Sequence, residues 1–520
     1  MSFDSSLAPI LKAVFSGPAR ARRLGLVAVL LAFAVSRAIY AFGFGFRFED
    51  QTLGYYMQYI DPTLLRSRLV ESLYYLRDQP PLFNLFLGVV LKAFPAHSQQ
   101  AFHVVYLGFG LTLVVSLYLL MVRLDVRPAL AAAVAVVYAV SPTNVLYEHW
   151  LFYTYPITAL LALSAVFLHR FVVDRRLRDA VVFFFLLATI ALGRGIFHFA
   201  WIAAPAIGLV VFCWPDRRRV ALAAIVPLLL VAAFYVKTYV VFGGFASGEL
   251  FQQLNLAAMT VKRLPPDVRK ALIQQGRLTP VSTTAIGAKT PLKAFDPYVP
   301  GRAPTGIPVL DQEEKPGGNT NWQSRAAADV AAVYGKDGLY VLKEYPGIYL
   351  QSVADNVARY VLPSSDTSPI VSKRGFGIKR AVNGRKVSGL VRVYNTVLGG
   401  QIRSRDTAWF LVVAFPACLL FALLLVGRWL WRRRPEADAA RVLTVLFGLF
   451  NIIYVSAVTL LFSAGDHNRY RFKVGPFYCL LFTMLLQALW SRRGLLPRLF
   501  GRRTPAPPIE LGSPGRTDSV

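Results

Sequence analysis

Long apolar stretches, separated by short polar and mostly basic segments, make up most of this chain. About ten of them are long enough, or nearly so, to cross roughly 30 Å of hydrocarbon as helices. These predicted spans are 24–43, 101–122, 129–145, 151–168, 180–193, 196–214, 220–242, 407–426, 442–462 and 474–490. The pattern therefore predicts an all-α polytopic membrane protein with about ten transmembrane helices.

One further apolar stretch, Pro80–Phe94, is shorter and begins with two prolines. If it crossed the membrane, Arg123 and Arg127 would lie outside, whereas basic residues mark the cytoplasmic side. We therefore interpret it as an interfacial helix of the first outer loop, with its apolar face in the lipid. Both termini are then cytoplasmic, and the outer face carries residues 44–100, three short turns and residues 243–406.

This topology divides the chain into four parts. They are an N-terminal membrane module of seven spans (1–242) with its first outer loop (44–100), an extracytoplasmic domain (243–406), three C-terminal spans (407–490) and a cytoplasmic tail (491–520). The tail is rich in proline and glycine near its end, so we expect it to be disordered.

The extracytoplasmic segment is long enough for a small domain. Residues 276–321 are rich in Gly, Pro and Thr and predict extended loop. Residues 324–362 have the apolar spacing of a helix, interrupted at Gly335, Gly338 and Pro346. We therefore expect a mixed, mainly helical domain.

The composition is also that of a membrane protein, and the placement of its charges argues against nucleic-acid binding. The chain has 520 residues, 55% hydrophobic, with 57 Lys plus Arg against 28 Asp plus Glu and a net charge of +29. The basic residues cluster at the ends of apolar stretches, as positive-inside topology requires, rather than forming a nucleic-acid patch. We predict a multi-pass protein of a bacterial inner (plasma) membrane that contacts lipids and no nucleic acid.

The first outer loop opens with two adjacent carboxylates, Glu49 and Asp50, directly after the first span and among aromatic residues. Burial in partly apolar surroundings raises the pKa of a carboxylate toward the range in which a general base works. An interfacial turn that only marks the end of the helix is the alternative. We expect Asp50 to be the base and Glu49 to be a neighbour that positions substrate.

Further polar residues fall on the same predicted outer face. They are Gln79 before two prolines, Glu148 and His149 after the third span, Arg194 between two glycines, and Arg469 and Arg471 before the last span. Asp50, Glu148 and His149 also have the ligand types of a hard-cation site. We predict no metal site and no required cofactor, with a divalent cation left open as an alternative.

The order of these motifs resembles a known family. Asp50 after the first span, Pro80-Pro81-Leu82 opening an interfacial helix, Glu148 in the second outer loop and Arg194 followed by glycine are similar to GT-C glycosyltransferases of the protein O-mannosyltransferase and aminoarabinose-transferase kind. The turn at residues 468–472, Asn-Arg-Tyr-Arg-Phe, is similar to a motif of bacterial relatives. The resemblance covers the first seven spans and implies the GT-C fold.

The resemblance implies an inverting glycosyltransferase that moves a monosaccharide from a polyprenyl-phosphate carrier to an acceptor hydroxyl on a glycolipid, polysaccharide or protein at the periplasmic face. Asp50 would take the hydroxyl proton as the oxygen attacks the anomeric carbon, and Glu148 would position acceptor or base. Arg194, with Arg469 and Arg471, would stabilise the negative charge on the departing phosphate.

Two positions depart from the family pattern. Gln79 stands where a basic residue is usual, so we expect it, like His149, to position substrate. Arg194 replaces a lysine, and its planar guanidinium suits phosphate oxygens. Two other functions stay open: an O-antigen ligase or polymerase with a lipid-diphosphate donor, and a lipid-linked sugar transporter or flippase, for which mid-membrane ionisable residues are expected.

Overall fold

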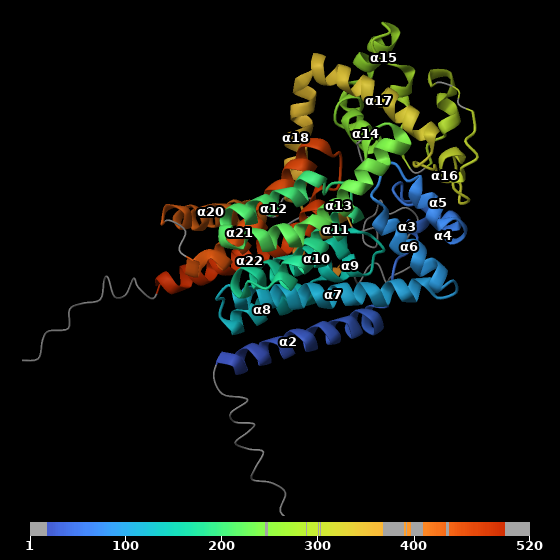
Figure 1. Ribbon diagram of the computed structural model, residues 1–520. Coiled ribbons are helices and arrows are strands. Elements are labelled where there is room, and N and C mark those ends of the chain that lie inside the picture. Colours follow the sequence, from blue (N-terminus) through green and yellow to red (C-terminus); the bar gives the residue numbers. More distant parts are fainter. Residues whose placement is uncertain are drawn as a thin grey trace, which may run out of the picture.

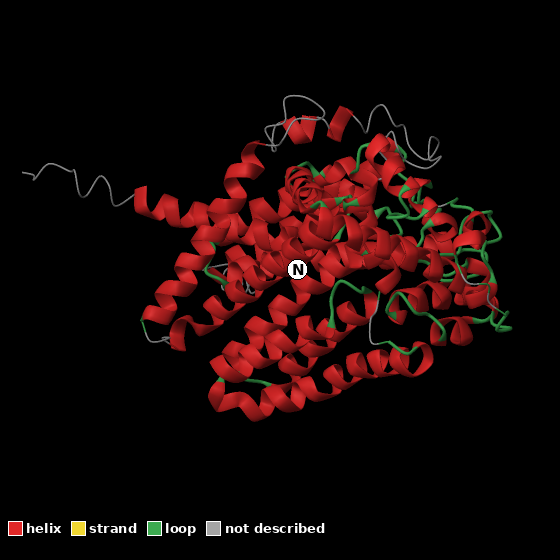
Figure 2. Cartoon of the chain, turned by 90° about the horizontal axis from the view of Figure 1, so that it is seen from above, coloured by secondary structure: helices red, strands yellow, loops and turns green. Residues whose placement is uncertain are grey.

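The protein is described here from a computed structural model (Figure 1). The structure describes residues 18–244, 248–287, 289–299, 301, 303–367, 389–391, 393–396, 409–432 and 436–493. Within these residues every regular element is a helix, and extended pairing is limited to isolated bridges (Figure 2). The prediction of an all-α protein is therefore confirmed, whereas most of the predicted tail, 491–520, lies outside the described residues.

The membrane helices follow the predicted apolar stretches. They are α2 (Pro18–Ala38, continued by the π-helical turn Ile39–Gly43), α7 (Ser98–Arg123), α8 (Pro128–Val140), α9 (Pro142–Glu148), α10 (Thr154–Asp174), α11 (Leu177–Gly193), α12 (Phe199–Phe212), the 3-10 turn Trp214–Asp216, α13 (Arg217–Phe242), α20 (Trp409–Trp431), α21 (Glu436–Phe462) and α22 (His467–Arg493). In the described chain, seven helices are long and apolar enough to span a membrane, or eight if α8 and α9 count as one span. α11 and α12, with 17 and 14 residues, also follow predicted spans but are shorter than these helices.

The third predicted span is broken. α8 ends at Val140, α9 begins at Pro142, and the two helices are bent by 56°. Proline has no N–H and disfavours helical geometry in the residue before it, so the helix stops at Ser141. The Ser141 hydroxyl then caps α9 by accepting a hydrogen bond from the Asn144 N–H at 3.2 Å. A single straight helix over 129–145 is therefore wrong.

The centre of the bundle is α10. It packs against α7, α11, α21 and α22. In its most apolar stretch of 18 residues 72% of the residues are buried, against 28% in the corresponding stretch of the first span. α2 instead packs on the outside of α7 and α8. The loop that precedes α10 is therefore held among several helices, which is where the polar residues described below lie.

Four short helices occupy the segment that was predicted to be the first outer loop, and we keep that name for it. They are α3 (Thr52–Tyr55), α4 (Pro62–Ser67), α5 (Leu69–Tyr74) and α6 (Pro81–Ala93). α6 is the helix that was predicted over 80–94, and it packs against α4, α7 and α11. In Figure 1 this group sits beside one end of α7, next to the green and yellow segment that was predicted to be the extracytoplasmic domain (residues 243–406), which we call the outer domain.

The outer domain is mainly helical, as predicted. It contains α14 (Glu249–Met259), α15 (Pro266–Gln274), α16 (Pro308–Asp311), α17 (Arg325–Glu344) and α18 (Pro346–Tyr360), with 3-10 turns at Val261–Arg263, Pro280–Thr283, Leu292–Tyr298 and Ser364–Thr367. The expected interruption at Gly335 and Gly338 is wrong, because α17 runs through both. A Cβ at Gly338 would lie 3.1 Å from the backbone nitrogen of Ala257. These glycines therefore let α17 pack closely on α14.

Candidate active site

Loops from distant parts of the chain meet around Tyr153, just before α10. The Tyr153 hydroxyl lies 3.0 Å from the Tyr56 hydroxyl of the first outer loop. It also accepts a hydrogen bond at 3.2 Å from Arg469, on α22. Arg194, which follows α11, stacks on the Tyr153 ring at 4.2 Å from its centroid. The structure therefore brings together segments that were predicted to share one face.

Arg194 is held by two glutamines of the first outer loop. One of its terminal nitrogens, NH1, donates to Oε1 of Gln79 at 2.9 Å and also to Oε1 of Gln58. Its Nε has no hydrogen-bond partner among the residues described. Gln79 thus contacts Arg194 with a neutral side chain. It leaves the charge of Arg194 uncompensated.

α22 adds two basic residues from one side of the helix. Arg469 and Lys473 are four residues apart, which puts them on the same helical face. The Lys473 Nζ lies 5.5 Å from the ring centroid of Tyr153 and 4.1 Å from that of Tyr470. Tyr153 therefore contacts three basic side chains, Arg194, Arg469 and Lys473, which we call the basic cluster.

The basic cluster is buried, and few acidic side chains balance its positive charge. The exposed fractions of Arg194, Arg469 and Lys473 are 4%, 5% and 0%. Within the described ranges its one ion-pair partner is Asp466, 3.5 Å from Arg469 Nε, and this carboxylate side chain is 55% exposed. Lys473 Nζ lacks a hydrogen-bond partner in the same ranges. Since buried, uncompensated cations cost several kcal/mol, the cluster is a candidate anion site.

A cavity of about 1350 Å³ opens beside the cluster. Gln58, Gln79, Arg194 and Arg469 line one part of it. Apolar side chains of α14, α17 and α21 line another part, among them Leu256, Met259, Leu339, Leu342, Val458 and Leu461. The volume exceeds the roughly 300–1,000 Å³ of common small-molecule pockets, so the cavity suits a ligand with an anionic head and a long apolar part.

The segment that carries Glu49 and Asp50 pairs with the loop after α9. The Glu49 N–H donates to the His149 carbonyl at 2.7 Å, and the Leu151 N–H donates to the Glu49 carbonyl at 2.8 Å. This forms a parallel bridge between Glu49 and Trp150. The bridge fixes both carboxylates beside the chain that leads to Tyr153. Neither Glu49 nor Asp50 lines the cavity described above.

The two adjacent carboxylates differ in what they contact. Glu49 is buried, and its Oε1 accepts a hydrogen bond from the Gln51 N–H at 2.8 Å. Asp50 is partly exposed, and its Oδ1 lies 3.4 Å from Gln99 Nε2, a long hydrogen bond. Burial raises the pKa of both groups above the usual range of a carboxyl. Asp50 is therefore the more accessible of two carboxylates that hold protons more tightly than usual.

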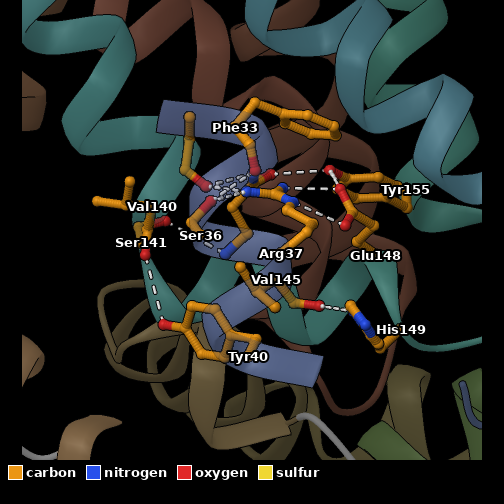
Figure 3. Close-up of polar contacts among 12 residues, drawn as sticks. Phe33, Ser36, Arg37, Tyr40, Val140, Ser141, Val145, Glu148, His149 and Tyr155 are labelled. Atoms are coloured by element: carbon orange, nitrogen blue, oxygen red, sulfur yellow. Dashed lines mark hydrogen bonds and ion pairs between the residues drawn. The ribbon is translucent and has the colours of Figure 1, made fainter. Parts of the chain in front are cut away.

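Glu148 forms an ion pair with Arg37 of the first span (Figure 3). Nε and NH2 of Arg37 donate to its Oε1 and Oε2 at 2.9 and 2.7 Å, and the Tyr155 hydroxyl donates to Oε2 at 2.9 Å. A side chain at Gly110 would collide with this carboxylate, so glycine leaves the space that the pair occupies. The structure therefore joins α2, α9 and α10 through Glu148 and does not bring it to the basic cluster.

Arg471 and His149 also lie apart from the cluster. Arg471 donates to the Tyr360 carbonyl and, at 3.1 Å, to the Ser364 hydroxyl, so it ties α22 to the end of the outer domain. The Nδ1 of His149 lies 3.0 Å from the Val145 carbonyl, as Figure 3 shows. Burial lowers the pKa of His149 to about 4, so the ring is neutral at neutral pH.

The residues considered for a hard cation are not assembled into such a site. The Glu148 oxygens face Arg37, and Asp50 faces Gln99. In the part of the chain that the structure describes, no group of three or more His, Cys, Asp and Glu side chains could hold a metal ion.

Several residues of the site were missed from the sequence. Lys473 had a usable signal, because its four-residue spacing from Arg469 puts both on one helical face. Tyr153 and Gln58 had none, since a tyrosine or a glutamine in an outer loop is unremarkable by itself. Arg37 was missed because a basic residue near the end of a span usually reaches toward headgroups.

Comparisons with known proteins give limited similarity. No protein-family profile matches the chain, and no curated protein matches it. Among solved structures it is similar to the oligosaccharyltransferase AglB of Archaeoglobus fulgidus in complex with an inhibitory peptide and a dolichol-phosphate, with 13% identity, a TM-score of 0.35, and coverage of 92% of this chain and 52% of that one.

Two other structures of the Archaeoglobus fulgidus oligosaccharyltransferase are also similar. The form tethered to an acceptor peptide with an NVT sequon has 13% identity, a TM-score of 0.38, and coverage of 95% and 52% of the two chains. The apo form has 12% identity, a TM-score of 0.33, and coverage of 92% and 52%. The chain thus spans about half the length of the solved structures it matches. Because unrelated activities share folds, function has to be argued from the site.

Proposed function

We propose that this protein is a membrane glycosyltransferase whose sugar donor is linked to a lipid through phosphate. The basic cluster of Arg194, Arg469 and Lys473 binds the phosphate, and the cavity beside it takes the first part of the lipid chain. The acceptor is a hydroxyl group on a glycolipid, polysaccharide or protein at the outer face of a bacterial inner membrane. The sequence resemblance to GT-C glycosyltransferases motivates the sugar-transfer chemistry.

The observation that carries this proposal is the charge imbalance of the basic cluster. Three basic side chains are buried together, and their one ion-pair partner among the described residues is a half-exposed carboxylate. A bound phosphate would supply the missing negative charge, and guanidinium–phosphate pairs are among the stronger hydrogen bonds in proteins. Arg194 Nε and Lys473 Nζ have no hydrogen-bond partner among the described residues, and we assign both as donors to the phosphate; Arg194 lines the cavity, whereas Lys473 is not among its lining residues.

The shape and lining of the cavity favour a lipid over a soluble phosphate. The apolar side chains of α14, α17 and α21 continue from the polar part of the same cavity. Each methylene group buried there stabilises binding by about 0.8 kcal/mol. A soluble phosphate would leave this apolar lining without a partner.

Asp50 is the proposed general base. Its carboxylate takes the proton of the acceptor hydroxyl while the acceptor oxygen forms a bond to the anomeric carbon and the bond from that carbon to the phosphate oxygen breaks. The leaving lipid phosphate keeps the electron pair, and the basic cluster stabilises its added negative charge. Partial exposure and the long hydrogen bond from Gln99 favour Asp50 for this role over Glu49, which is buried and accepts a shorter bond.

A lipid-diphosphate donor is the second candidate. A phosphodiester donor carries one negative charge and a diphosphate diester carries two, whereas the basic cluster offers three basic groups against Asp466. The count of charges favours the diphosphate donor, and an O-antigen ligase or polymerase uses such a donor. The sequence resemblance favours the monophosphate.

The experiment supplies purified protein with a radiolabelled polyprenyl-phosphate sugar or a lipid-diphosphate sugar, together with cell-envelope extract as the source of acceptors. We expect label to move from the lipid to an envelope glycan, and Arg194→Gln to lower the initial rate about a hundredfold, like the loss of one oxyanion-stabilising donor. No transfer from either donor in any envelope fraction would contradict the proposal.

Arg471→Gln is the matched control. Arg471 lies on α22 only two residues from Arg469, but it contacts Tyr360 and Ser364 rather than the basic cluster. We expect its transfer rate to stay within about threefold of the wild type, measured on folded protein. If the Arg194 and Arg471 variants lost the same fraction of the transfer rate, the loss would come from a general effect of removing a buried charge and not from a contact with the donor phosphate.

A further inference from the structure

A turn of the outer domain is bonded to the same loop that holds Arg194. Lys315 and Asn319 close this turn, since the Lys315 N–H donates to the Asn319 carbonyl at 2.7 Å and the Asn321 N–H donates to the Glu313 carbonyl at 2.8 Å. Gly318 takes a positive φ of 71° inside it, a conformation that glycine adopts without strain. We call residues 313–323 the outer turn.

Lys315 reaches from the outer turn into the first outer loop. Its Nζ donates to the Tyr56 carbonyl at 3.0 Å and to the Tyr59 carbonyl at 2.9 Å. The side chain is 3% exposed. Burial lowers its pKa to about 8, against a smaller opposing effect of Asp61. A buried lysine whose Nζ donates to two backbone carbonyls of one turn fixes the conformation of that turn.

Two more side chains of the outer turn bond the same loop. Asn319 Nδ2 lies 3.4 Å from the Gly54 carbonyl, and Gln323 Nε2 donates to the Met57 carbonyl at 3.2 Å. Residues 54–59, which we call the site turn, thus have four carbonyls bonded by three outer-domain side chains. Irregular buried backbone needs such partners, because unpaired carbonyls are costly to bury.

Gln58 stands in the middle of the site turn. Its side-chain oxygen accepts from Arg194, and its backbone carbonyl accepts a long bond of 3.4 Å from Asn84 on α6. The position of its amide therefore depends on the carbonyls that Lys315 and Gln323 hold on either side.

The second glutamine of the site has a similar attachment. Asp78, directly before Gln79, accepts a hydrogen bond at 3.0 Å from the Leu250 N–H at the start of α14. Arg77 pairs with Glu249 at 3.2 Å in the same place. Both glutamines that contact Arg194 are therefore flanked by bonds to the outer domain.

We propose that Lys315 is a positioning residue for the phosphate site: by holding the Tyr56 and Tyr59 carbonyls it sets Gln58 against Arg194, so the outer domain controls donor affinity without touching the donor. This inference rests on the proposed function, because it assigns the purpose of the Arg194 contact. It predicts that Lys315 and Gln58 act as one unit.

The test measures binding of farnesyl phosphate and of farnesol to the full-length protein in detergent, for the wild type, Lys315→Met, Gln58→Ala and the double variant. We expect Lys315→Met and Gln58→Ala each to weaken farnesyl phosphate binding about tenfold. The double variant should be no weaker than about tenfold, because coupled residues are not additive. Farnesol binding, a readout without phosphate, should be unchanged in all four proteins.

Lys293→Met is the matched control, since Lys293 is an exposed lysine of the same domain; it should bind like the wild type. If Lys315→Met does not fold, Gln323→Ala, which removes one bond to the same turn, replaces it with the same expectation. Two results would overturn the role of Lys315 and leave the proposed function intact. One is a Lys315 or Gln323 variant that keeps the wild-type preference for farnesyl phosphate over farnesol. The other is a double variant whose loss of farnesyl phosphate affinity equals the two single losses combined. Equal wild-type binding of farnesol and farnesyl phosphate would overturn the proposed function.

Discussion

Two groups of buried charges in this protein contrast in how they are balanced. Arg37 and Glu148 form a complete pair, with both carboxylate oxygens occupied and the Tyr155 hydroxyl as a further donor. Arg194 and Lys473 of the basic cluster instead have nitrogens without partners in the described chain. A closed pair stabilises a fold, whereas an open cluster of one sign is a site for a ligand of the opposite sign.

The same contrast separates the neighbouring acids Glu49 and Asp50. Glu49 accepts a backbone hydrogen bond at 2.8 Å and is buried, whereas Asp50 is partly exposed and lies at a longer distance, 3.4 Å, from Gln99 Nε2. The charge of a side chain is therefore a weaker guide to its chemistry than the hydrogen bonds that its atoms already make.

The largest effect is expected at Asp50. Asp50→Asn removes the proposed base and should lower the transfer rate about 10²–10⁴-fold, measured as label moved from the lipid donor, while Glu49→Gln should stay within about tenfold. Burial raises the pKa of Asp50, and the base acts when deprotonated. Wild-type activity should therefore fall as the pH drops through a pKa above the ordinary 3.8 of an aspartate. Full activity of Asp50→Asn would rule out the base assignment.

Breaking the closed pair should cost stability rather than chemistry. Glu148→Gln leaves the buried Arg37 charge without its partner and should lower the free energy of unfolding by about 3–5 kcal/mol, measured by thermal or denaturant unfolding in detergent. Replacing both residues, as Arg37→Met with Glu148→Leu, should recover most of that loss. A Glu148→Gln protein of normal stability without transfer activity would instead place Glu148 in the reaction.

Filling the space beside the pair is expected to have a smaller effect. A methyl group at Gly110 meets the Glu148 carboxylate and lies 2.9 Å from the Tyr155 hydroxyl. Gly110→Ala should therefore destabilise the protein by about 1–3 kcal/mol, the usual cost of overpacking. Gly108→Ala, which adds a methyl group into open space on the same helix, is the control and should leave the unfolding temperature almost unchanged.

Removing one positive charge from the basic cluster should have the smallest effect on stability, and that effect should be a gain. Lys473→Met removes one of three buried basic groups, so the ligand-free protein should gain stability, on the order of 1 kcal/mol. The same variant should bind farnesyl phosphate more weakly in a titration. A loss of stability comparable to that of Glu148→Gln would show that Lys473 belongs to a satisfied network.

The class of fold followed from the sequence because a membrane imposes long apolar helices. Hydropathy located α7, α10, α13, α21 and α22, and charge placement excluded a crossing at α6. The break at Ser141 was not anticipated, because hydropathy counts apolar residues and does not register where a proline ends a helix. The continuity of α17 through Gly335 and Gly338 depends on contacts with α14, which no local pattern contains.

The site was predictable in part. Gln79, Arg194 and Arg469 do meet, because loop order and charge placement indicate which end of the bundle a residue occupies. Glu148 and Arg471 were expected with them and lie elsewhere, since these patterns do not say which side of a helix a charge faces or which partner it meets. Lys315 touches residues more than two hundred positions away, and such pairings cannot be read from spacing.

The most direct measurement is a cryo-electron microscopy map of the protein with bound polyprenyl phosphate. We expect phosphate density within hydrogen-bond distance of Arg194, Arg469 and Lys473, with the lipid chain running along the apolar lining of the cavity from α14 to α21. Phosphate density bound instead at the surface arginines Arg175, Arg176, Arg178 and Arg219, which line a separate shallow cavity, with none at the basic cluster, would contradict it.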